Sequence, residues 1–269
     1  MPSAVLTTVM YSFFIFYLTF FFCKSNILIL IRGEKAMKTR QLVEDVINEY
    51  SANEIFFASR LYKERLSELI TEAAYYKILE RMCNAQTLLN IARGIYCRPE
   101  ITQYGPLGPS EAQILEAFTD NGSGTVVGYA LYNHLGLTTQ VSKRTEVFSH
   151  NLEQDTKTIG SICVSRHRLD YSKPVSDTVA MLEVLKHFDE IQDMNYKIFI
   201  EYAKEFANNY RQDVFEYVSA EIKYQKRTIA FLREILNYYG ISNSLSGQLS
   251  ALTRYNYPKM EKINELARV

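Results

Sequence analysis

The chain has 269 residues, of which 47% are hydrophobic and 22% are charged, a composition typical of a globular protein and too apolar for a disordered one. Thirty basic and thirty acidic residues cancel, which argues against a polycation of the histone type. The four cysteines lie far apart and form no C-x-x-C motif, so neither a zinc finger nor a dense disulfide framework is expected. A reducing cytosol is therefore the simplest compartment.

The first 36 residues differ in character from the rest. Residues 4–23 are almost entirely apolar and carry no charge. A segment of this length can span a bilayer. If they did so, the basic residues that follow would leave the remainder cytoplasmic. A second interpretation is translation of AT-rich non-coding DNA, because Arg32-Gly33-Glu34 can be encoded by a purine-rich run resembling a bacterial ribosome-binding sequence. We expect Met37 to be the native start, and a tryptic peptide from residues 1–35 of the native protein would refute this.

Residues 37–100 have the pattern of three short helices followed by a β-hairpin. A first apolar stripe at helical spacing includes Val43 and Ile47, and Phe56, Phe57 and Leu61 suggest a second helix. The third helix opens at Thr71, a favourable N-cap, and its inward face consists of Tyr75, Ile78, Leu79 and Met82.

Two β-prone runs come next. They cover residues 88–92 and 95–97 and are separated by Arg93-Gly94, which is typical of a tight turn. Three helices and a hairpin in this order predict a winged helix-turn-helix, in which the third helix enters a major groove of DNA and the hairpin touches the backbone.

Such a helix needs long polar side chains that reach base edges or phosphates. The candidate DNA-binding residues are Thr71, Tyr76, Lys77, Arg81, Arg93 and Arg98. Lys77 and Arg81 are the strongest candidates for contacts from the helix, whereas Arg93 and Arg98 lie where a wing meets phosphate. Residues 37–100 hold nine basic and nine acidic residues, so a merely solvated, mixed-charge face remains the alternative.

Four short motifs resemble AbiEi-family antitoxins in the same order and at similar spacing. They are LNIARGIYCRP over 89–99, Tyr104-Gly105 with Pro109-Ser110, GYALYNHLGLTTQ over 128–140, and TKTIGSI over 156–162 with Arg166-His167. The resemblance covers residues from about 40 to about 190. The chain departs from the family pattern at Ser142-Lys143-Arg144 and at Tyr75-Tyr76, which leaves the operator sequence undetermined.

The resemblance implies a bacterial antitoxin that also acts as a transcriptional autorepressor. Its winged helix would bind inverted repeats in its own promoter, as a homo-oligomer on the DNA. Its C-terminal domain would neutralise a nucleotidyltransferase-like toxin encoded beside it, in many family members by opposing the toxin's effect without stable binding. The expected location is the cytoplasm, with a membrane anchor only if residues 4–23 are genuinely translated.

Residues 101–192 predict a mixed α/β domain, and residues 193–269 a helical C-terminal region, so the expected fold class is α+β. Pro99 and the run 105–109 mark a linker, and Ser110-x-x-Gln113 is a capping box. Strands are expected over 145–149, 157–159 and 162–164, the last two joined by Gly160-Ser161. Helical stripes follow from Ser176, with one continuous helical stretch over 214–239.

Motifs for catalysis are lacking. The four histidines form no H-E-x-x-H pair, and no P-loop or G-x-S-x-G motif occurs. No D-x-D pair is present, although nucleotidyltransferases hold two metal ions with closely spaced aspartates. We therefore expect neither an enzyme, a metal site nor a cofactor. The alternative to a DNA-binding antitoxin is a helical protein–protein interaction module without DNA binding, membrane-anchored if the first segment is real.

Overall fold

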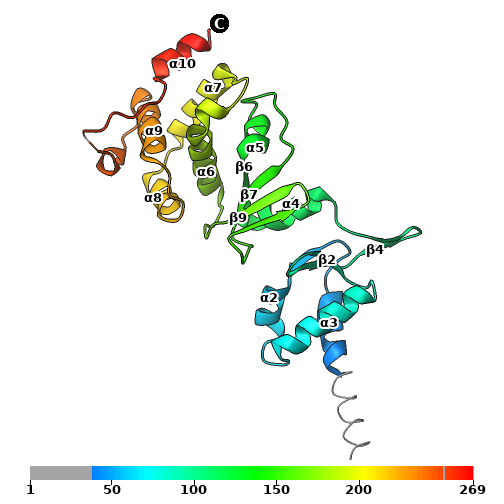
Figure 1. The fold of residues 1–269 in the computed structure, drawn as a ribbon. Helices are drawn as coiled ribbons and strands as arrows, with labels where there is room; N and C mark the ends of the chain where they lie inside the picture. Colours follow the sequence, from blue (N-terminus) through cyan, green and yellow to red (C-terminus); the bar gives the residue numbers. More distant parts are fainter. Residues whose placement is uncertain (1–37, 251, 269) are drawn as a thin grey trace, which may run out of the picture. The chain divides into compact units, whose positions relative to one another are not determined.

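A computed structural model describes residues 38–250 and 252–268, and the chain divides into two compact units, residues 1–109 and 110–269. The apolar segment 4–23 and the expected start at Met37 lie outside the described residues. Each unit has a hydrophobic core of its own, one built from residues between Val43 and Tyr96 and the other between Val127 and Ile263. The architecture is α+β, as the sequence predicts (Figure 1).

The first unit alternates short helices with a small antiparallel sheet of strand order β1-β3-β2. Its elements are a helix over 38–48, β1 Ile55–Phe57, α2 Ala58–Leu61, the π-helical turn η1 Tyr62–Leu66, α3 Glu72–Asn84, β2 Leu89–Ala92 and β3 Ile95–Cys97. The third helix and the hairpin therefore form where the sequence predicts them. The four inward residues of α3 are all buried, which confirms its predicted apolar face.

Strand β1 replaces part of the second helix expected from the sequence. Phe56 and Phe57 pair with β3, so the helix begins only at Ala58. Phe56 lies directly opposite Tyr96, with ring centroids 6.0 Å apart, and its ring centroid is 4.9 Å from that of Tyr50. Residues 55–57 are too few to specify a strand by their own sequence. Their contacts with residues distant in the chain favour the strand over the helix.

A second hairpin occupies the segment predicted to be a linker. Strands β4 Glu100–Thr102 and β5 Gly105–Leu107 pair in register, with Ile101 opposite Pro106. Three of its large side chains are exposed, Ile101 at 74%, Tyr104 at 92% and Leu107 at 54%. The division between the units lies directly after this hairpin, between Pro109 and Ser110, and not at residue 100.

The second unit contains a four-stranded mixed sheet of order β6-β7-β9-β8. The strands are β6 Gly124–Val127, β7 Thr145–Ser149, β8 Thr156–Ile159 and β9 Ile162–Arg166, and the helices α4 Glu111–Thr119 and α5 Gly128–His134 belong with them. The capping box at Ser110 and Gln113 is formed, and β8 and β9 make the expected antiparallel hairpin.

Helix α6 (Lys173–Lys186) stands between this sheet and the remaining helices (Figure 1). Nine of its residues are buried, as in a helix surrounded by neighbours on all sides. The helices that follow are α7 Tyr196–Asn208, α8 Gln212–Glu221, α9 Lys226–Tyr238 and α10 Met260–Leu266. One core runs through residues on both sides of the expected boundary at 192, so the second unit is a single body.

The stretch predicted as continuous helix over 214–239 is two helices, because Ile222 adopts an extended conformation at the end of α8. Within the described ranges, no helix combines the length and hydropathy needed to cross a membrane.

Candidate nucleic-acid interface

Helix α3 is the element from which most of the predicted DNA-binding side chains project. Its N-cap is Thr71, whose hydroxyl accepts a hydrogen bond from the backbone N–H of Ala74 at 3.4 Å. This satisfies one of the backbone donors left open at a helix start. Thr71 is exposed but its hydroxyl serves the cap, so it fixes where the helix begins.

The solvent-facing side of α3 carries two cations one helical turn apart. Lys77 and Arg81 are both exposed, and neither is paired with a carboxylate in the parts of the chain that the structure describes. Glu72 and Glu80 are exposed on the same helix, so its net charge is close to neutral. What distinguishes Lys77 and Arg81 is their availability to an external anion.

Two other cations of the first unit, Arg65 and Arg40, are already paired with carboxylates. The Arg65 guanidinium donates to both oxygens of Glu49, at 3.0 and 3.1 Å, and lowers the pKa of that carboxyl. Arg40 pairs with Glu44 at 2.7 Å. Because each guanidinium already has a carboxylate beside it, both residues attract a phosphate less strongly than Lys77 and Arg81 do.

Tyr76 is less available than the sequence suggests. Its side chain is only partly exposed and packs against the core of the first unit. The ring lies 5.3 Å from that of Tyr75, which is fully buried. The tyrosine pair thus anchors α3 to its unit, whereas Lys77 and Arg81 of the same helix are exposed.

Arg93 occupies the turn between β2 and β3. The turn is made possible by Gly94, which has φ +80°, a backbone conformation that favours glycine over residues with a side chain. The carbonyl of Gly94 accepts a hydrogen bond of 2.9 Å from the N–H of Ala58, which fixes the turn against the start of α2. Arg93 itself is exposed, as a contact with the DNA backbone requires.

Arg98 has a structural partner that the sequence did not reveal. Its Nη1 donates to the backbone carbonyls of Asn48 at 3.2 Å and Tyr50 at 2.6 Å. These carbonyls lie where the first helix ends. Arg98 directly follows β3, so its side chain ties that helix end to the sheet. The phosphate contact predicted for Arg98 stays a prediction, and only the Nε and Nη2 atoms are left to make it.

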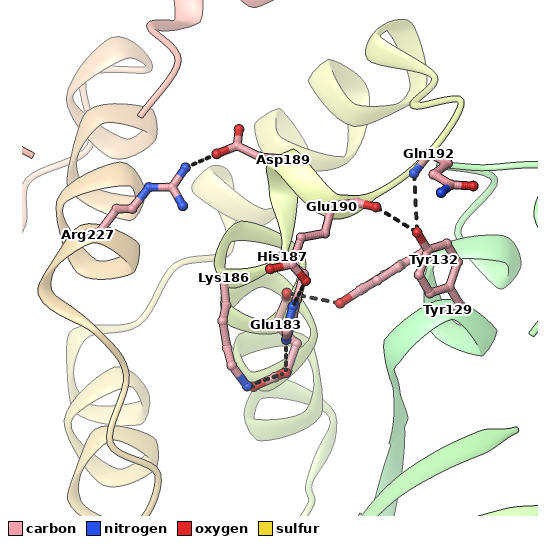
Figure 2. Close-up of polar contacts among 9 residues, drawn as sticks. All are labelled: Tyr129, Tyr132, Glu183, Lys186, His187, Asp189, Glu190, Gln192 and Arg227. Atoms are coloured by element: carbon pink, nitrogen blue, oxygen red, sulfur yellow. Dashed lines mark hydrogen bonds and ion pairs between the residues drawn. The ribbon is translucent and has the colours of Figure 1, made fainter. Parts of the chain in front are cut away.

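A second polar cluster lies in the other unit, around the buried carboxylate of Glu183 (Figure 2). Lys186 approaches Glu183 at 3.1 Å and His187 at 3.7 Å, and His187 Nδ1 lies 2.7 Å from Glu190. The spacing i, i+3 and i+4 on one helix face is the signal that could have predicted this histidine beside two carboxylates.

The hydroxyls of two tyrosines from α5 tie this cluster to the sheet side of the unit. Tyr132 donates to the carbonyl of Glu183 at 3.1 Å, and Tyr129 donates to that of Glu190 at 2.7 Å (Figure 2). These bonds connect α5 to Glu183 of α6 and to the turn over residues 188–190 that follows this helix. Among the described residues, no group of three or more His, Cys, Asp or Glu side chains is arranged to hold a metal ion.

Comparisons with known proteins add a family match without a function. A family of unknown function, DUF6088, matches residues 43–158, which begin within the first helix and extend into β8. The chain is also similar to the crystal structure of the RV2827C protein from Mycobacterium tuberculosis, at 8% identity and a TM-score of 0.36, covering 74% of this chain and 76% of that one. A likeness at this level indicates neither fold nor function. No curated protein matches the chain.

Proposed function

We propose that the first unit is a winged helix-turn-helix that binds duplex DNA through α3. The order helix, strand, helix, helix, hairpin supports this proposal, as does the pairing of β1 with β3 beside the hairpin. In this arrangement α2 and η1 precede the turn over 67–71, and α3 is the recognition helix.

The observation that carries the proposal is the pair of exposed, unneutralised cations on α3. Lys77 and Arg81 extend from one face of a helix whose opposite face is fully buried. An arginine so placed can donate two hydrogen bonds to a guanine edge, and a lysine can contact phosphate. Arg93 at the hairpin turn supplies a further backbone contact.

The proposed biological role is that of an antitoxin and transcriptional autorepressor. Its support is the resemblance of four motifs to AbiEi-family antitoxins, two of which lie in the second unit. In this role a homo-oligomer occupies inverted repeats of its own promoter, and the second unit neutralises a nucleotidyltransferase-like toxin encoded beside it. The cytoplasm is the proposed location.

A binding assay on the upstream promoter fragment tests DNA recognition. We expect the full chain to shift this fragment more strongly than a scrambled fragment of equal length. Arg81→Ala is expected to weaken binding by about 1–3 kcal/mol, and Lys77→Ala to weaken it similarly on both fragments. Lys197→Ala, which removes an exposed charge from α7 in the other unit, is the matched control and should bind normally.

Equal binding by wild type and Arg81→Ala would refute the assignment of α3. A complete lack of binding to the promoter fragment would instead favour the helical interaction module. The antitoxin role is tested separately, by expressing the neighbouring reading frame in a bacterial host with and without this chain. Growth arrest that this chain does not relieve would refute that role.

A further inference from the structure

The turn that precedes α3 is held by Tyr62, the first residue of η1. Its backbone carbonyl accepts a hydrogen bond of 2.8 Å from the N–H of Ser67. Its side-chain hydroxyl donates to the carbonyl of Ile70 at 3.0 Å. Ile70 directly precedes Thr71, the N-cap of α3. The two hydrogen bonds of Tyr62 therefore join the beginning of η1 to the last residue before the recognition helix.

The ring of Tyr62 also contacts α3 itself. Its centroid lies 5.4 Å from that of Tyr75, and the two ring planes are inclined at 27°. Tyr75 is fully buried on the inner face of α3. Tyr62 thus holds the helix at two points, just before the N-cap through its hydroxyl and one turn after it through its ring. Contacts at two separate points restrict the rotation of a helix against its unit more than one contact does.

The orientation of α3 matters differently for the two kinds of DNA contact proposed above. A contact between Arg81 and a guanine edge needs two N–H groups aligned with two acceptors, so a small rotation of the helix weakens it. A contact between Lys77 and a phosphate is mainly electrostatic and tolerates such a rotation. A residue that sets the orientation of α3 therefore affects base recognition more than it affects general affinity for DNA.

We propose that Tyr62 is a positioning residue for base recognition, which holds α3 in the orientation from which Arg81 reaches a base edge. Tyr62 acts through Ile70 and Tyr75 and needs no contact with DNA. Its side chain is half-buried and packs on the core of the first unit, so Tyr62→Phe removes the hydroxyl and keeps the packing of the ring. The inference rests on the proposed DNA binding and adds how a sequence preference is maintained.

Binding of Tyr62→Phe to the upstream promoter fragment and to the scrambled fragment tests this inference. We expect the ratio of the two affinities to fall by about threefold to tenfold, as for the loss of one neutral hydrogen bond. The affinity for the scrambled fragment and its dependence on salt should stay as in wild type. Tyr50→Phe makes the same chemical change in the same core, at a ring beside Phe56 of β1, and should keep the wild-type ratio.

The wild-type chain separates a failure of this inference from a failure of the proposed function. If wild type prefers the promoter fragment and Tyr62→Phe has the same affinity ratio, the inference alone is overturned. Equal losses on both fragments would mean that Tyr62 only keeps the first unit folded, which would also overturn the positioning role, and urea unfolding gives the folded fraction of each variant. If wild type does not prefer the promoter fragment, the proposed recognition and this inference both fall.

Discussion

Replacing Arg98 with alanine separates the structural role of this arginine from the DNA contact predicted for it. Its Nη1 makes two hydrogen bonds, to the carbonyls of Asn48 and Tyr50. A hydrogen bond involving a charged group contributes about 1.5–3 kcal/mol, and the partial exposure of Arg98 places the pair near the lower end. We therefore expect Arg98→Ala to destabilise the first unit by about 2 kcal/mol.

Hydrogen exchange measured by mass spectrometry is the suitable assay, because the two units need not unfold together. Peptides covering residues 42–50 and 96–100 should exchange faster in Arg98→Ala, whereas Lys77→Ala should leave their exchange unchanged. Weaker DNA binding by Arg98→Ala with unchanged exchange would refute the structural role and favour a phosphate contact.

Other parts of the structure give three further expected outcomes. Lys77→Ala should reduce the slope of log binding constant against log salt concentration by about 0.9, and an unchanged slope would exclude a phosphate contact. Gly124→Ala should destabilise the second unit by about 3 kcal/mol or more in urea unfolding. The reason is that a methyl group there would overlap the backbone carbonyl oxygens of Phe118 and Phe148, whereas Gly247→Ala meets nothing within 4 Å and should unfold as wild type does. Burial lowers the pKa of His167, so its contribution to stability should be complete above about pH 6.5 and fall on acidification, and urea titrations of His167→Gln should show a flatter dependence.

Elements with strong local signals were predictable. Thr71 as an N-cap and the buried face of α3 follow from helical spacing, and the structure confirms both. The turn at Gly94 and the hairpin of β8 and β9 follow from short β-prone runs around glycine. The capping box at Ser110 depends on only two residues three positions apart, which is why it can be recognised without knowledge of the fold.

The candidate site was predictable only as a set of side chains. Periodicity places Lys77 and Arg81 on the outer face of α3, but it does not say which cations nearby are already paired. That Arg65 is bound by Glu49 and that Arg98 holds two carbonyls depends on residues 16 to 50 positions apart in the chain. Tyr76 is likewise partly covered by the core of the first unit, which its position on the predicted outer face of α3 did not reveal.

The sequence by itself determined the segments whose hydrogen bonds and apolar spacing are local: α3, the capping box at Ser110, the hairpin of β2 and β3, and the hairpin of β8 and β9. Tertiary structure alone decided that Phe56 belongs to a strand, that the chain is extended at Ile222 between α8 and α9, and that the carboxylate of Glu183 is buried in the second unit. The physical reason is the separation in sequence between the residues that interact. Local backbone bonds and periodic faces are set within a few residues, whereas strand pairing, charge neutralisation and cavities arise where distant segments meet.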